Sequence, residues 1–130
     1  MAWWLLIVGI GVLDRLIRTF FVGAHLQISS VTGLSGYRWA MISSVLVGMA
    51  VIATMRWQTQ RRPILVASGA MIVVGGINNI VDLFIYRGVI DYWTISHPWG
   101  MFWFNAADGM IISGVIYWFI DLLHSDTKIN

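Results

Sequence analysis

The chain has 130 residues, of which 58% are hydrophobic and 11% are charged, and its formal net charge is +2. Ordinary soluble domains carry about 25% charged residues, so this composition is typical of a membrane protein. The lack of cysteine excludes disulfides, thiolate nucleophiles and cysteine-ligated metals. Because a basic nucleic-acid footprint needs clustered Lys and Arg, a net charge this small predicts no nucleic-acid partner.

Four apolar stretches predict transmembrane helices, because a bilayer core of about 30 Å requires roughly 20 helical residues. In chain order the expected spans cover Ala2–Ala24, Trp39–Met55, Pro63–Tyr86 and Met101–Leu123. The first lacks the basic start and the cleavage site of a removable signal peptide, so it is predicted to be retained. The predicted fold class is therefore an all-α membrane protein, with one four-helix domain over residues 1–130.

The connections between these spans predict the topology. Arg56–Pro63 holds three arginines and no acid, which places it in the cytoplasm by the positive-inside rule. Both termini are then cytoplasmic, and the connections Ala24–Tyr37 and Arg87–Gly100 face outward. Ala24–Tyr37 is too polar to span, and its short alternation followed by glycines predicts a strand or turn at the membrane surface.

Asp91 and Asp108 flank the second outward connection and are the candidate catalytic pair. Two carboxylates held close together share a proton, which gives one acid and one base, as in aspartic proteases. Asn105 is predicted one turn before Asp108 on the same helix face, where its amide is expected to orient a carboxylate. The alternative, equally weighted on residues alone, is a solvated Asp91 and a structural Asp108 that hydrogen-bonds to a neighbouring helix.

Further charges interrupt the predicted spans. Asp14 and Arg18 lie at i,i+4 in the first span and are predicted to form an ion pair on one helix face. Charges inside a bilayer need such compensation, so a structural pair is the favoured interpretation before any family comparison. Asp82, near the outer end of the third span, is expected to accept a backbone hydrogen bond or to pair with an arginine.

The remaining candidate groups have structural interpretations. Three histidines fall on both sides of the predicted membrane, so a three-histidine metal site is not expected: His25, His97 and His124. An aromatic cluster in the second outward connection is predicted either to cap the acids or to anchor the connection at the interface, the latter being favoured. Its members are Tyr92, Trp93, Trp99, Phe102 and Trp103.

Three short motifs resemble the core of a known family. Asn79–Asp82 reads NIVD, Gly88–Tyr92 reads GVIDY and Phe104–Asp108 reads FNAAD. They resemble the motifs of signal peptidase II, the lipoprotein signal peptidase, with the strongest match over Val74–Asp108. On this resemblance the chain is identified as a divergent and short member of the family.

The resemblance implies an integral membrane aspartyl endopeptidase that cuts diacylglyceryl-modified prolipoproteins before the lipidated cysteine. It implies a bacterial-type cytoplasmic (inner) membrane location with the site near the outer face, no metal or cofactor, membrane lipid as surroundings, and a monomer. Asp91 and Asp108 match the catalytic aspartates, and Leu26–Gly36 is expected to supply a small extracytoplasmic β-cradle. Substrate-binding or supporting roles are implied for Asp14, Arg18, Asn79, Asp82 and Asn105.

The chain also departs from the family pattern. Leu83 replaces an arginine, Arg18 replaces a lysine with different geometry, and Val31–Gly36 keeps only a glycine of an outward-loop motif. These departures motivate an alternative function, a non-catalytic descendant or helper that binds lipidated peptides. A small proton-coupled transporter ranks lower, because the inverted repeats typical of many transporters are not evident.

Overall fold

The protein is described here by a computed structural model that covers residues 2–21, 27–30, 42, 45–50, 52–53 and 63–126. The elements in chain order are α1 (Ala2–Phe21), β1 (Gln27–Ser30), α3 (Pro63–Tyr86), β2 (Gly88–Asp91), β3 (Trp93–His97), β4 (Gly100–Phe104) and α4 (Ala106–Asp126). Residues 42, 45–50 and 52–53 are also helical and fall within the second predicted span, and the rest of that span lies outside the described residues.

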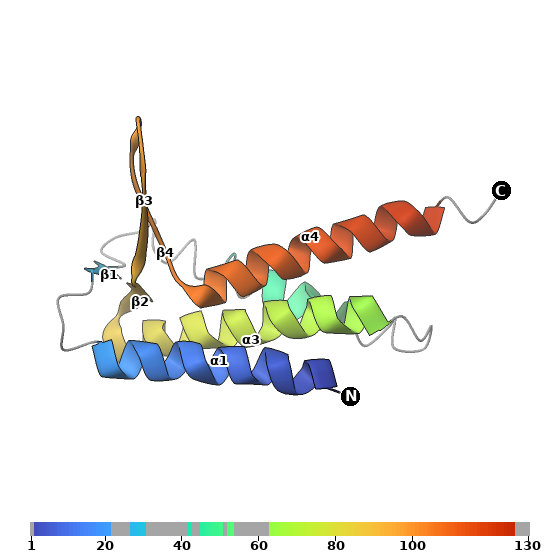
Figure 1. Ribbon diagram of the computed structural model, residues 1–130, viewed down its shortest axis with the longest axis horizontal. Coiled ribbons are helices and arrows are strands. Elements are labelled where there is room, and N and C mark those ends of the chain that lie inside the picture. The colour runs from blue at the N-terminus through green and yellow to red at the C-terminus, as the bar shows by residue number, and fades with distance from the viewer. Residues whose placement is uncertain are drawn as a thin grey trace.

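The three long helices lie side by side, and the strands gather at one end of them (Figure 1). α3 packs against both α1 and α4 and is the central helix. α1 and α3 run in the same direction, whereas α4 runs back along them, so α1 begins and α4 finishes at the end opposite the strands. Because α1 and α3 are parallel, α3 also begins at the end opposite the strands.

α3 covers the third predicted span, from Pro63 to Tyr86, and confirms that prediction. Proline suits the first helical position because the N–H it lacks would have no partner there. With a mean hydropathy of 2.0, α3 is the one helix among the described residues long and apolar enough to cross a membrane by length and composition. α1 begins at Ala2 as predicted and is helical to Phe21, and the remainder of the first predicted span lies outside the described residues.

Glycines let α3 and α4 approach closely. A Cβ added to Gly75 would lie 2.5 Å from the carbonyl oxygen of Ala107, and one added to Gly114 would lie 2.7 Å from that of Ser68. At Gly76 an added Cβ would meet the side chain of Val47. Small residues at these positions therefore let the neighbouring helix backbones pack closely.

The predicted start of the fourth span was wrong. Met101–Phe104 belongs to β4, which pairs antiparallel with β3 in a register that runs from Trp93↔Phe104 to His97↔Gly100. Gly100 has a φ of 137°, a conformation that strongly favours glycine, where the hairpin turns. α4 begins only at Ala106, because the hydrogen-bonding side chain of Asn105 caps it.

A second pair of strands, β1 and β2, lies at the same end of the bundle (Figure 1). β1 pairs antiparallel with β2, and Gln27 lies opposite Asp91. The predicted strand structure in Leu26–Gly36 is thus confirmed for Gln27–Ser30, and the rest of that stretch lies outside the described residues. Arg87 has a φ of 58°, the left-handed conformation that commonly ends a helix, and it turns the chain from α3 into β2.

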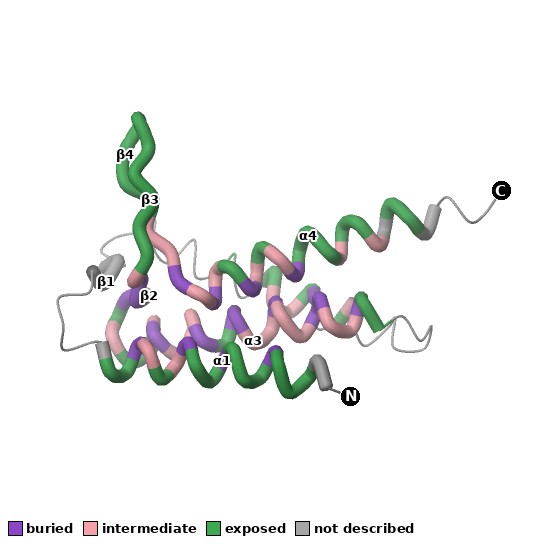
Figure 2. The backbone as a smooth tube through the Cα atoms, viewed as in Figure 1, coloured by how far each residue is buried: buried purple, intermediate pink, exposed green. Residues whose placement is uncertain are grey.

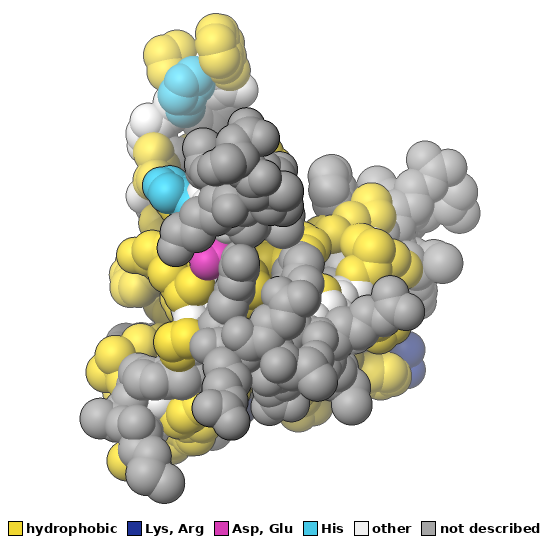
Figure 3. All heavy atoms as spheres, turned by 90° about the vertical axis from the view of Figure 1, so that its right-hand side faces the viewer, with side chains coloured by type: hydrophobic (Ala, Val, Ile, Leu, Met, Phe, Trp, Pro, Cys, Tyr) yellow, Lys and Arg dark blue, Asp and Glu magenta, His cyan; other side chains and the backbone are white. Residues whose placement is uncertain are grey.

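Buried residues line the facing sides of the helices and the start of α4, whereas the β3–β4 hairpin projects from the bundle and is mostly exposed (Figure 2). A view from the end of the bundle opposite the strands shows that the described side chains visible there are mainly hydrophobic (Figure 3). Large apolar side chains such as Leu5, Phe84 and Phe119 are exposed on all three helices. Helices that are apolar on their outer faces as well as their inner ones are typical of a protein surrounded by lipid.

Candidate active site

The two candidate catalytic acids come from different elements at the strand end of the bundle. Asp91 is the last residue of β2 and is 6% exposed. Asp108 lies in the first turn of α4. Asn105, which directly precedes α4, contacts both carboxyl groups. The solvated-loop position that the structural alternative gave to Asp91 was wrong, because Asp91 is buried at the end of β2. The other half of that alternative is confirmed, since Asp108 accepts a hydrogen bond from Asn79 of the neighbouring helix α3.

Asn105 and Asp108 cap α4 reciprocally. The Asn105 side-chain oxygen accepts a hydrogen bond from the Asp108 backbone N–H at 3.0 Å. The Asp108 carboxylate in turn accepts one from the Asn105 backbone N–H at 3.2 Å. This is a capping box with Asn and Asp in the two positions, and it satisfies two N–H groups that a helix start leaves unpaired.

The Asn105 side-chain amide also holds the other acid. It donates to the Asp91 carboxylate at 2.7 Å and to the carbonyl oxygen of Ile90 at 3.3 Å, and Asn105 is fully buried. The prediction that Asn105 orients a carboxylate from within the helix was wrong in position, because Asn105 precedes the helix and its amide binds Asp91. A single residue thus contacts both candidate catalytic acids.

A buried ion-pair layer lies beside the two acids. Arg18 pairs with Asp14 at 2.9 Å and also with Asp82, and all three side chains are fully buried. Asp82 further accepts the backbone N–H of Ile90 at 3.1 Å. The predicted Asp14–Arg18 pair is confirmed, and Asp82 makes both of the contacts predicted as alternatives. Among the described residues, no buried side-chain nitrogen or oxygen lacks a hydrogen-bond partner.

Asn79 links this layer to the candidate catalytic pair. Arg18 donates to its side-chain oxygen at 3.0 Å, and its amide nitrogen donates to the Asp108 carboxylate at 2.8 Å. Because the arginine can only donate, the Asn79 oxygen must face it, which leaves the amide N–H₂ to face Asp108. The orientation of Asn79 is therefore fixed by its two partners.

Arg15 is a member of this network that sequence reasoning missed. It pairs with Asp82 at 2.6 Å and donates to the backbone oxygen of Asn78 at 2.6 Å, with a side chain that is 26% exposed. Arg15 and Arg18 are three residues apart, so they lie on one helix face, and this spacing was the signal available in the sequence. The residue after Asp82 is Leu83, where the family pattern has an arginine. Both arginines that pair with Asp82 come from α1 instead.

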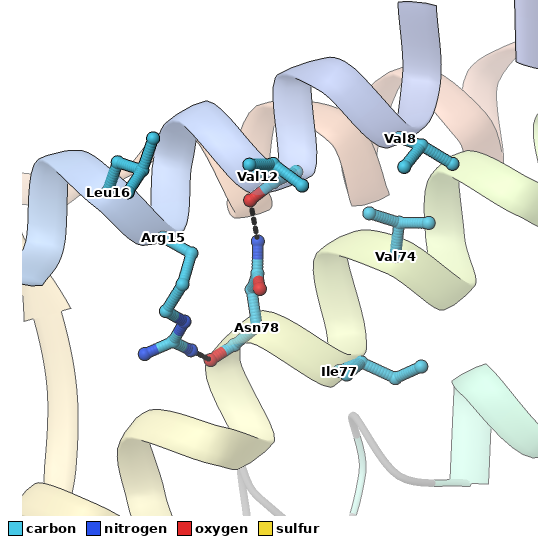
Figure 4. Close-up of a pocket in the computed structure, with 8 residues that line it drawn as sticks. Val8, Val12, Arg15, Leu16, Val74, Ile77 and Asn78 are labelled. Atoms are coloured by element: carbon cyan, nitrogen blue, oxygen red, sulfur yellow. Dashed lines mark hydrogen bonds between the residues drawn. The ribbon is translucent and has the colours of Figure 1, made fainter. Parts of the chain in front are cut away.

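Arg15 borders a groove of about 300 Å³ between α1 and α3 (Figure 4). The side chains that line it are mostly aliphatic: Val8, Val12, Leu16, Val74 and Ile77, together with Gly11, Arg15 and Asn78. Asn78 closes one side, because its amide donates to the Gly11 carbonyl oxygen at 2.9 Å and to Asp14 at 3.0 Å. Asn78 is a second network member that the sequence did not single out.

Tyr92, a member of the predicted aromatic cluster, contacts the Trp93 ring with its own ring and the polar network with its hydroxyl. Its hydroxyl donates to the Asp14 carboxylate at 2.6 Å and accepts the Ala106 backbone N–H at 2.9 Å, so it belongs to the polar network. Trp93, by contrast, is 49% exposed on the hairpin. No group of three or more His, Cys, Asp or Glu side chains within the described ranges is arranged to hold a metal ion.

These features define a class of protein: apolar helices that enclose a fully hydrogen-bonded network of aspartates, arginines and asparagines at one end. Comparison with known families then identifies it. The family described as signal peptidase (SPase) II matches residues 6–124, and the chain belongs to this family. The family resemblance drawn from the three motifs is therefore confirmed, and the family is membrane-integral in bacteria.

Individual relatives agree with the family. The chain is 32% identical to lipoprotein signal peptidases of Methylorubrum extorquens (strain PA1) over 88 residues and of Xylella fastidiosa (strain 9a5c) over 105 residues. These matches cover 66% and 76% of this chain. The protein of the same name from Caulobacter vibrioides is 32% identical over 99 residues, or 72% of this chain. The matches span 50%, 60% and 56% of the relatives' own lengths, so the chain is similar to little more than half of each.

Proposed function

We propose that this chain is a membrane-embedded aspartyl endopeptidase that removes the signal peptide from diacylglyceryl-modified prolipoproteins, cutting before the lipidated cysteine. The observation that carries the proposal is the contact of Asn105 with both acids, 2.7 Å to the Asp91 carboxylate and 3.2 Å from its backbone nitrogen to that of Asp108. Family membership and the lipoprotein signal peptidase relatives supply the substrate class.

The proposed chemistry follows from two carboxyl groups that share one proton. The ionised member accepts a proton from a water molecule, which attacks the scissile carbonyl carbon, while the protonated member donates to the carbonyl oxygen. Asp108 and Asp91 take these roles as a pair. Asn105 contacts both acids and holds them in place. Asn79 donates to Asp108 and is itself held by Arg18. Arg18 is in turn fixed by its ion pairs with Asp14 and Asp82.

The proposed topology has four spans, with both termini cytoplasmic and the acids near the outer face of the cytoplasmic membrane. The parallel direction of α1 and α3 supports it, since the chain must cross the bundle between them. The substrate is proposed to enter sideways from the bilayer, because acyl chains are retained there by about 0.8 kcal/mol per buried CH₂. A monomer suffices for this, since both acids come from one chain.

The test is cleavage of a lipidated prolipoprotein peptide by the purified protein in detergent. Asp91→Asn and Asp108→Asn are each expected to abolish turnover while retaining the fold. Asp121→Asn, on α4 away from these acids, is the matched control. Near-full activity in either variant would refute the two-aspartate mechanism, and lipopeptide binding without turnover in the wild type would favour the non-catalytic, peptide-binding alternative.

A further inference from the structure

Tyr92 joins two helices through one hydroxyl group. It lies between β2 and β3, and its hydroxyl donates to the Asp14 carboxylate of α1 at 2.6 Å. The same oxygen accepts the backbone N–H of Ala106, the first residue of α4, at 2.9 Å. The hydroxyl therefore sits between α1 and the start of α4, and it contacts neither Asp91 nor Asp108 among the hydrogen bonds described above.

The Ala106 contact reaches the turn that holds both acids. The N–H groups of the first helical turn have no partner within their helix, so their direction is set by whatever accepts them. Asn105 precedes Ala106 and contacts Asp91 through its side chain and Asp108 through its backbone. A hydroxyl that fixes the Ala106 N–H consequently fixes the peptide unit from which Asn105 reaches the two carboxylates.

Asp14, which accepts the hydrogen bond from the Tyr92 hydroxyl, is itself held in place. Asp14 is 1% exposed and accepts hydrogen bonds from Arg18 at 2.9 Å and Asn78 at 3.0 Å, as well as from Tyr92. Burial raises the pKa of the Tyr92 phenol above its ordinary value, and the hydrogen bond to Asp14 raises it further. The phenol therefore keeps its proton across the whole range in which carboxyl groups titrate, so it remains able to donate to Asp14 there.

We infer that Tyr92 is a positioning residue, whose hydroxyl aligns the start of α4 with α1 so that Asn105 holds Asp91 and Asp108 in register. The inference rests on the proposed function for its catalytic consequence. It assigns the hydroxyl a role in the relative placement of the two acids, because its acceptor contact is to the turn that carries Asn105. Loss of the hydroxyl leaves Ala106 N–H without this acceptor and removes one of the three donors to Asp14.

The first test follows the NMR signals of the carboxyl groups in Tyr92→Phe, which keeps the ring and removes only the hydroxyl. All six acidic residues are aspartates, so selective ¹³Cγ-aspartate labelling gives six carboxyl signals by NMR in detergent. The chemical shifts of the Asp91 and Asp108 carboxyl carbons are expected to change, because the hydrogen bonds that Asn105 makes to both groups change. Tyr117→Phe, an exposed tyrosine on α4, is the matched control and should leave them unchanged. A response confined to Asp14 would overturn the inference.

Hydrogen exchange of the wild-type protein tests the same contact without a variant that must fold. The Ala106 amide is expected to exchange slowly, unlike an unbonded amide of a first helical turn. Exchange of Ala106 at the rate of an unbonded first-turn amide would overturn the inference that the Tyr92 hydroxyl holds this N–H group.

Turnover separates this inference from the proposed function. With the lipidated peptide, Tyr92→Phe is expected to lower kcat about tenfold to hundredfold while KM changes little, because misplaced groups lose reaction geometry rather than binding. Equal kcat in wild type and variant would refute the inference and leave the protease intact. Unchanged KM and lowered kcat per folded molecule distinguish positioning from simple loss of folded protein. If the wild type does not cleave, changed Asp91 and Asp108 carboxyl signals in Tyr92→Phe still support the positioning role while the proposed function fails.

Discussion

Replacing Arg18 tests the ion-pair layer most directly. Arg18 is fully buried, pairs with Asp14 and with Asp82, and donates to Asn79. Arg18→Met keeps much of the side-chain volume and removes the charge, which leaves two buried carboxylates with one cation, Arg15, beside Asp82. Breaking a buried ion pair in this way costs about 3–5 kcal/mol, because the remaining charge is left uncompensated.

Arg15→Met is the matched comparison. Among the residues that the structure describes, Arg15 forms an ion pair with Asp82 alone, and its side chain is 26% exposed, so water screens part of its charge. Its loss is expected to cost about 1–2 kcal/mol, between the ranges for surface and buried ion pairs. Arg18→Lys keeps the charge but loses the planar fork, so it should fall between wild type and Arg18→Met.

The assay is the free energy of unfolding in detergent, followed by tryptophan fluorescence against denaturant for all variants under one set of conditions. Arg18→Met is expected to be the least stable by a wide margin. A loss under about 1 kcal/mol in Arg18→Met, or one no larger than in Arg15→Met, would refute the reasoning that buried aspartates depend on this arginine.

Three further predictions follow from single contacts. Asn105→Ser keeps a capping side chain but loses the donor to Asp91, so it should retain stability and lose most turnover, whereas Asn105→Ala should also lose about 0.5–2 kcal/mol of unfolding free energy. Gly75→Ala should destabilise by about 1–3 kcal/mol, because its Cβ would lie 2.5 Å from the Ala107 oxygen. Gly9→Ala, with open space around it, should be neutral or stabilising. Trp99, 93% exposed at the hairpin tip, should be quenched by lipids brominated near the headgroup in vesicles, as expected of an interfacial tryptophan.

Each of these has a result that contradicts it. Full turnover in Asn105→Ser would remove Asn105 from the alignment of the acids. Equal stability of Gly75→Ala and Gly9→Ala would mean that α3 and α4 separate at no cost. Bromine quenching of equal size in the wild type and in Trp99→Phe would show that Trp99 does not lie at the interface.

The sequence predicted those features that depend on local spacing. Asp14 and Arg18 are one helical turn apart, so their pairing follows from helix geometry alone. α3 was predicted from Pro63 to Tyr86 because a continuous apolar run after a proline has few alternatives. Met101–Phe104 was assigned to a helix because its apolar residues are nearly continuous with the apolar residues of the helix that follows. Only the helix cap at Asn105 separates the strand from the helix.

The spacing of residues along the sequence could not predict contacts between distant parts of the chain. Arg15 meets Asp82, 67 residues away, and the adjacent Asp14 offered a nearer partner. Tyr92 looked like one of several interfacial aromatics, and its hydroxyl became significant only once α1 and α4 were brought together. Packing of the helices decides these pairings, and neither hydropathy nor motif carries that information.

The direction of the hydrogen bonds explains how asparagines can serve two carboxylates without competing with them. Arg18 occupies the oxygen of Asn79, so the Asn79 amide can only donate toward Asp108. The Asp108 backbone N–H occupies the oxygen of Asn105, so the Asn105 amide can only donate toward Asp91. Each amide thus has its acceptor side satisfied by a fixed donor and presents N–H groups to one acid. An aspartate at either position would present an acceptor to an acceptor, which is why two amides rather than two further acids suit this arrangement.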